Sequence, residues 1–142
     1  MADDSPDSGV FQELSREDCE DYLRSAIVGR LAYIGSTQIE ILPINYLYHD
    51  GAVVLRTSPY GPLAALARGS DGVAFEIDHH DDLTQSGWSV VVHGRIAAIT
   101  ETAELAALSE RARPNPWAAG TRTLYLRIEP TSMTGRQVRA AR

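Results

Sequence analysis

The chain has 142 residues, a net charge of −6 and 13 basic residues, all of them arginine, which suits a single acidic domain with its own core. The negative charge argues against nucleic acid as a partner, because such binding neutralises phosphates. No apolar run approaches the ~20 residues of a membrane span, the acidic N-terminus lacks a signal-peptide pattern, and the single Cys19 excludes an intrachain disulfide. We therefore expect a cytoplasmic protein without nucleic-acid or membrane partners.

The pattern along the chain predicts one domain between two short tails. Residues 1–12 are acidic and polar, which predicts a disordered tail, and residues 138–142 read as a basic C-terminal tail. Between them we expect a single domain over residues 13–137.

The first half of that domain has one helix pattern followed by strand patterns. Ser15 and the acidic residues after it predict the N-cap and first turn of a helix over 16–26. Asp50-Gly51 predicts a two-residue hairpin turn. The expected strands are 29–35, 39–48 and 52–57.

The second half begins with a change to helical spacing. Pro62 suits a first-turn position and Gly69 a C-terminal stop, which predicts a helix between Pro59 and Gly69. Further on we expect strands over 73–78, 88–100 and 124–128, a polar loop over 79–86, and a helix over 101–112. About six strands and three helices favour a mainly β fold, a β-barrel with flanking helices.

The sequence offers no recognisable catalytic or metal motif. Acidic and imidazole side chains gather between Glu76 and Asp82, but their spacing favours a strand and a solvated loop over a metal site. His93 lies in a strand pattern, where a packed or surface histidine is favoured and a haem ligand is the alternative. The acidic neighbours of Cys19 predict a raised thiol pKa, which argues against a nucleophilic role.

Arg56-Thr57-Ser58 is the most interesting candidate for binding an anion. It ends a strand just before the predicted helix, where a guanidinium, two hydroxyls and the N–H groups of a helix N-terminus suit a phosphate. A solvated arginine followed by an ordinary turn is the alternative.

Three further residues admit a binding role. Trp88 at a strand start is a core residue by default and a wall for a planar ring in the functional interpretation. Pro43 in a strand pattern predicts an edge or bulge with free backbone groups. Asn45 alternates with apolar neighbours, which is consistent with a polar cleft.

Taken in order, these segments resemble the pyridoxamine 5′-phosphate oxidase-like, FMN-binding split-barrel family, and most closely its short flavin-nucleotide-binding branch common in actinobacteria. The resemblance covers about residues 14–136. It rests on Val28-Gly29-Arg30-Leu31-Ala32, Pro43-Ile44-Asn45-Tyr46, Leu55-Arg56-Thr57, Phe75-Glu76-Ile77-Asp78, Gly87-Trp88-Ser89-Val90 with Gly94, and Thr134-Gly135-Arg136.

The resemblance implies a six-stranded split barrel that forms a homodimer with two flavin sites at its interface. FMN is the expected cofactor, a deazaflavin coenzyme is the alternative and haem is less favoured. Trp117 of the other protomer would close the site. The implied cofactor contacts are Pro43, Ile44, Asn45 and Tyr46 along the isoalloxazine ring, Arg56, Thr57 and Ser58 at the phosphate with Gly61 beside them, and Trp88 and Ser89 near the ring and ribityl region.

One position departs from the family pattern. Members usually carry a glycine and then a phosphate-binding lysine shortly after the Arg-Thr pair, whereas Pro62 occupies the lysine position here and removes both a cation and an N–H donor. Losing one charge-assisted contact lowers affinity roughly ten- to a hundredfold. We therefore expect a flavin- or deazaflavin-dependent oxidoreductase acting on a small molecule, with a non-catalytic flavin or haem carrier and a dimer without cofactor as alternatives.

Overall fold

The computed structural model describes residues 10–111 and 124–140. Residues 1–9 of the predicted acidic tail, Trp117 and its proline-bounded loop lie outside the described residues. The helices are α1 (Arg16–Ser25), the 3-10 helix η1 (Pro62–Arg68) and α2 (Thr102–Arg111). The strands are β1 (Val10–Glu13), β2 (Val28–Ile34), β3 (Ile39–His49), β4 (Ala52–Thr57), β5 (Ser70–Asp81), β6 (Ser86–Ala98) and β7 (Leu124–Arg139).

The strands of the described chain form one antiparallel sheet in the order β1-β7-β4-β3-β2-β5-β6. An additional pairing of β6 with β7 closes the last six strands of this order into a barrel. The predicted mainly β fold, a six-stranded barrel with flanking helices, is thereby confirmed, and β1 adds a seventh strand at the edge.

Two predicted local signals are confirmed at atomic detail. The Ser15 Oγ accepts a hydrogen bond of 3.0 Å from the Asp18 N–H and caps α1. Asp50 and Gly51 join β3 to β4 with φ angles of +51° and +75°, the left-handed conformation that this hairpin turn requires. Both features depend only on residues within one turn of each other.

Strand β5 runs past Asp78, where the sequence predicted its end. Only residues 82–85 of the predicted polar loop over 79–86 form a turn, because His79, His80 and Asp81 pair with β6. The Asp81 side chain closes that turn by accepting hydrogen bonds from the Leu83 and Thr84 N–H groups. The charged side chains therefore line a regular hairpin.

The last strand likewise runs past its predicted end. Pro130 breaks the strand pattern in the sequence, but a bulge leaves Thr131 unpaired while pairing with β6 continues on both sides. The Thr131 hydroxyl donates to the His93 carbonyl at 3.1 Å. Pairing of β1 with residues 136–139 then makes strand of residues 10–12 and 138–139, which the sequence placed in the two tails.

The core fills the barrel interior and the space beneath α1. Leu31, Phe75 and Ile77 are fully buried inside the barrel. Leu63 and Leu66 of η1 join the same cluster, as do Cys19 and Leu23 of α1. On the outside, Leu108 of α2 packs on Val54 of β4, so α2 covers that part of the outer surface.

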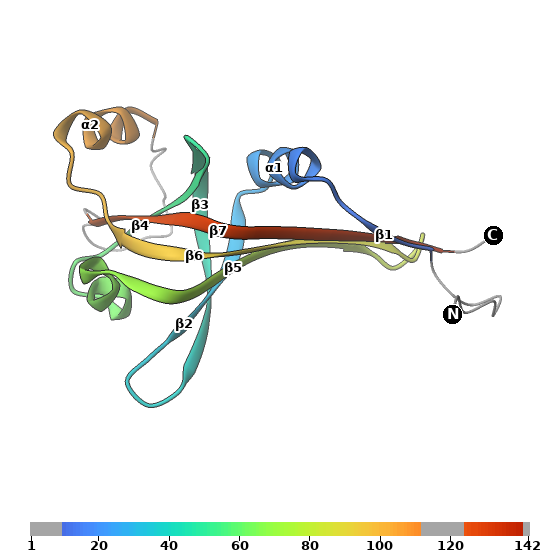
Figure 1. Cartoon of the computed structure of the whole chain (residues 1–142), viewed down its shortest axis with the longest axis horizontal. Helices are drawn as coiled ribbons and strands as arrows, with labels where there is room; N and C mark the ends of the chain where they lie inside the picture. The colour runs from blue at the N-terminus through green and yellow to red at the C-terminus, as the bar shows by residue number, and fades with distance from the viewer. Residues whose placement is uncertain (1–9, 112–123, 141–142) are drawn as a thin grey trace.

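Strands β5, β6 and β7 extend beyond the barrel as a long arm, with β1 along its edge (Figure 1). Helix α1 lies on one side of this arm, and no described element covers the other side. The β2–β3 hairpin points away from α1, on the side of the arm that α1 does not cover (Figure 1). The candidate functional site lies on this side.

Candidate functional site

Strand alternation divides the predicted residues of β3 between two environments. Pro43 and Asn45 are exposed on the outer face of the barrel, whereas Ile44 and Tyr46 point into the core. The Tyr46 hydroxyl donates to the Leu23 carbonyl at 2.7 Å, and burial raises its pKa. A ligand on the outer face would therefore meet the side chains of Pro43 and Asn45, but only the backbone of the other two.

Arg56 lies on the same outer face, near the end of β4. Tyr46 pairs with Leu55, so the same antiparallel register places Asn45 beside Arg56. The guanidinium lies 5.9 Å above the Tyr125 ring on the neighbouring β7. Thr57 points the other way and is buried. Of the first two residues of the predicted phosphate-binding segment, Arg56 thus faces solvent and Thr57 does not.

The turn after Ser58 differs from the helix N-terminus that the sequence indicated. The Tyr60 N–H donates to the Ser58 Oγ and the Gly61 N–H donates to the Ser58 carbonyl. Pro62 has no N–H and begins a 3-10 helix of seven residues. These turn N–H groups already have protein acceptors, so a phosphate here would rely on Arg56 and the Ser58 hydroxyl.

The centre of the outer face carries an ionic cluster. Arg30 of β2 pairs with Pro43 on one side and Glu76 on the other. Its Nη1 donates to the Glu76 Oε1 at 2.9 Å and to the Asp78 Oδ2 at 3.0 Å. Burial raises the pKa of Glu76, whereas a hydrogen bond from Glu76 and contact with Arg30 lower the pKa of Asp78.

Trp88 and Ser89 occupy opposite sides of the arm. The Trp88 ring stacks on Tyr22 of α1, with centroids 3.9 Å apart, and is half-buried. Ser89 points away from α1 and pairs in register with Asp78 on one side and Arg136 on the other. The structure therefore supports a packing role for one face of Trp88 and places Ser89 on the side of the arm away from α1.

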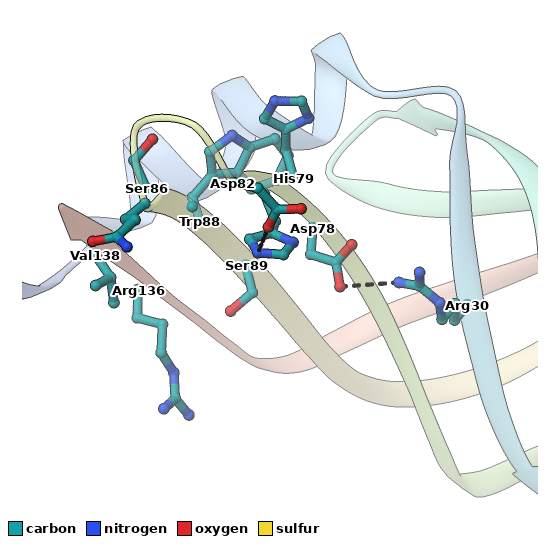
Figure 2. Close-up of a pocket in the computed structure, with 12 residues that line it drawn as sticks. Arg30, Asp78, His79, Asp82, Ser86, Trp88, Ser89, Arg136 and Val138 are labelled. Carbon is teal, nitrogen blue, oxygen red and sulfur yellow. Dashed lines mark hydrogen bonds and ion pairs between the residues drawn. The ribbon is translucent and has the colours of Figure 1, made fainter. Parts of the chain in front are cut away.

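A cleft of about 740 Å³ opens where the arm meets β2. We call it the arm cleft. Figure 2 shows the Ser89 and Arg136 side chains on one side of the sheet and Trp88 with His79 on the other. Its walls include Arg30, Asp78, His80, Ser86, Trp88, Ser89 and Arg136.

Sequence reasoning missed two arginines of this region as site residues. Arg30 and Arg136 both stand in segments that carried the resemblance, but neither was assigned a role. Arg136 lies eight positions beyond the predicted end of the last strand, and only its pairing in β7 brings it beside Ser89.

An apolar surface adjoins the ionic cluster on the β2–β3 hairpin. Ile34, Ile39 and Ile41 form what we call the isoleucine patch. Their side chains are 69%, 72% and 68% exposed, respectively. Ile34 pairs directly with Ile39, and Ile41 lies two residues further along the same face of β3. Three such isoleucines on one hairpin are unusual for a surface that faces only water.

The remaining sequence candidates have simple surroundings. Cys19 is buried on α1. Its burial, and to a lesser extent the negative charge of Asp18, raise the pKa of its thiol. His93 is exposed on β6. Within residues 10–111 and 124–140, no group of three or more His, Cys, Asp or Glu side chains is arranged to hold a metal ion. No helix in the same residues has the length and apolarity needed to cross a membrane.

Comparison with known proteins gives consistent matches over nearly the whole chain. Residues 15–137 match the model of the family described as pyridoxamine 5′-phosphate oxidase. The uncharacterized protein Rv0080 of Mycobacterium tuberculosis is 30% identical over 127 residues, covering 87% of this chain and 82% of that protein.

Solved structures show the same relationship. The FAD binding protein from Mycobacterium smegmatis superposes with a TM-score of 0.75 at 34% identity, covering 90% of this chain and 98% of that chain. A conserved protein of unknown function, DIP1874 from Corynebacterium diphtheriae, gives a TM-score of 0.69 at 25% identity, covering 89% and 96% of the two chains.

Proposed function

Since the chain belongs to the pyridoxamine 5′-phosphate oxidase family of split-barrel proteins, we propose that it binds a flavin nucleotide on its outer face. The main support is that four predicted contacts, Pro43, Asn45, Arg56 and Ser89, present side chains on one continuous outer surface. The flavin-binding relative of 34% identity adds support. FMN remains the expected cofactor, with FAD and a deazaflavin coenzyme as the other flavin-type ligands to test.

The residues fit a cofactor with a phosphate at one end and a flat ring at the other. Arg56 offers a two-pronged donor for the phosphate, and the Ser58 hydroxyl lies in the next turn. Pro43 and Asn45 present a shallow surface for the ring beside the ionic cluster. The buried Ile44 and Tyr46 hold this part of β3 against the core and keep that surface rigid.

In this proposal the protein is an oxidoreductase whose bound flavin exchanges hydride with a small molecule. The role of the chain is to bind and orient the cofactor, which explains why the sequence contains no evident catalytic pair. A carrier without turnover would need the same binding residues. Measurement of turnover with a reduced cofactor and candidate acceptors separates the two.

The isoleucine patch supports a homodimer. A stable interface buries roughly 1,200–2,000 Å² in total and has an apolar centre. The patch lies on the β2–β3 hairpin beside the proposed ring position, so a partner seated there would adjoin the flavin. In sedimentation velocity, wild type should be dimeric and Ile41→Glu monomeric. Leu83→Glu, a control at another exposed apolar residue, should remain dimeric; a dimeric Ile41→Glu would place the interface elsewhere.

Binding of the flavin is tested by titrating cofactor-stripped protein with FMN, FAD and the deazaflavin coenzyme while following ligand fluorescence. Arg56→Gln should raise the Kd roughly ten- to a hundredfold, because one charge-assisted contact is lost. Arg68→Gln, which removes an exposed arginine of η1, should leave the Kd unchanged. Equal affinity of wild type and Arg56→Gln would move the phosphate away from β4, and saturation by none of the three ligands would refute the proposal.

Haem is a second candidate because the exposed His93 of β6 pairs with Ala74 of β5, which in turn pairs with Ala32 of β2. The two small side chains leave a flat surface beside the imidazole. A Soret band that shifts on His93→Ala would favour this function. The same spectrum in both proteins would exclude His93 as the iron ligand.

A further inference from the structure

We propose that the arm cleft binds a small organic carboxylate, with Arg136 as its anchor. This proposal rests on the proposed flavin function, because the carboxylate would be the second ligand beside the flavin. The binding site itself is argued from the cleft.

The cleft has a suitable size and position. Its volume of about 740 Å³ falls within the ~300–1,000 Å³ typical of small-molecule sites. Arg30 lines the cleft and is the register partner of Pro43, so the cleft begins one strand away from the proposed ring position. The proposed phosphate position at Arg56 lies on the opposite side of that ring position, beyond Asn45. A ligand in the cleft would therefore adjoin the ring without competing for the phosphate.

The charges in the cleft leave one guanidinium for a ligand. Arg30 is engaged by Asp78 at 3.0 Å, and Asp82 lies 2.8 Å from His80. Arg136 forms no ion pair with any carboxylate in the part of the chain that the structure describes, and its guanidinium lies 5.6 Å above the Phe11 ring. Cation–π contact leaves the N–H groups in the guanidinium plane able to donate to a carboxylate.

Neighbouring groups complete a site for an anion with an apolar body. The Ser89 side chain lies on the same side of the sheet as Arg136, its register partner (Figure 2). Its hydroxyl can donate to the same carboxylate. Val138 lies two residues beyond Arg136 on the same face of β7, lines the cleft and provides apolar surface for the rest of the ligand. The arrangement pairs one bidentate cation with a partly apolar wall.

Benzoate and benzamide are matched probes, because they share a ring and differ in charge. Isothermal titration calorimetry on the full chain measures the Kd of each probe. Arg136→Gln removes the anchor, and Arg136→Lys keeps the charge but loses the fork. Arg139→Gln changes a nearby exposed arginine of β7 outside the cleft.

Benzoate should saturate the protein and bind at least about tenfold more tightly than benzamide. Arg136→Gln should abolish this preference, Arg136→Lys should retain part of it, and Arg139→Gln should leave it unchanged. Equal binding of both probes, or a benzoate preference that survives Arg136→Gln, would overturn the proposal.

A parallel flavin titration separates this proposal from the proposed function. Arg136→Gln should keep the flavin affinity that Arg56→Gln loses. Flavin binding without benzoate binding would refute only the cleft proposal. Benzoate binding without flavin binding would refute only the proposed flavin function. Retained flavin affinity also shows that the Arg136→Gln protein is folded, so loss of benzoate binding can be assigned to the cleft.

Discussion

Gly29→Ala is expected to destabilise the barrel, because the added methyl group would collide with a core ring. A Cβ at this position would lie 2.2 Å from the Phe75 Cζ and within 2.8 Å of both Cε atoms. Carbon atoms in ordinary contact are roughly 3.5–4.0 Å apart, so the ring would have to move by more than about 1 Å. Phe75 is fully buried and meets the Tyr46 ring edge-on at 4.8 Å, and the Tyr46 hydroxyl is held by Leu23.

Overpacking of this kind costs about 1–3 kcal/mol, and the rigid surroundings of Phe75 favour the upper half of that range. For a chain of this size a loss of about 2–3 kcal/mol lowers Tm by roughly 5–10 °C. The matched control is Gly72→Ala, whose Cβ would meet only the Ile34 Cδ1 at 3.5 Å. Its free energy of unfolding should change by less than about 0.5 kcal/mol.

Chemical denaturation at one fixed protein concentration measures both variants, because the proposed dimerisation would make stability depend on concentration. Phe75→Leu tests the mechanism, because the shorter side chain gives the new methyl group room. The double variant with Gly29→Ala and Phe75→Leu should lose less free energy of unfolding than the sum of the losses in the two single variants. Equal stability of Gly29→Ala and Gly72→Ala, or strict additivity with Phe75→Leu, would refute the collision argument.

Two further predictions concern the ionic cluster and the helix cap. Burial raises the pKa of Glu76 in the folded state, so its contribution to stability is present below its unfolded pKa and lost as pH rises through the folded value. The unfolding free energy of wild type minus that of Glu76→Gln should therefore fall as pH rises above the ordinary glutamate pKa of 4.5, and a flat or rising difference would contradict the raised pKa. Ser15→Ala removes the acceptor of the Asp18 N–H and should lower the free energy of unfolding by about 0.5–2 kcal/mol in chemical denaturation. Ser15→Asp should retain most of the stability, and equal stability of the alanine and aspartate variants would contradict a capping role for this side chain.

The positions of the site residues were partly predictable from alternation. The period of two along β3 correctly placed Asn45 between inward-facing neighbours. It did not reveal that Tyr46 would be anchored to α1, or that Trp88 would stack on Tyr22. Those contacts join segments more than twenty residues apart, and local periodicity carries no information about which segments meet.

The amino-acid sequence by itself determined the features that short-range chemistry controls. The cap at Ser15, the Asp50-Gly51 turn and the mainly β character each follow from backbone preferences and hydrogen bonds within a few residues. The number of barrel strands followed from counting such segments.

Only the tertiary structure decided how far the strands extend and what shares a surface. Pairing of β6 with β7 carries strand structure past Pro130, and pairing of β1 with β7 gives order to residues that look like tail. That pairing also brings Arg136 beside Ser89, 47 positions earlier in the chain. Backbone groups at a sheet edge gain partners wherever a second segment can align, so strand length and the arm cleft both depend on long-range register.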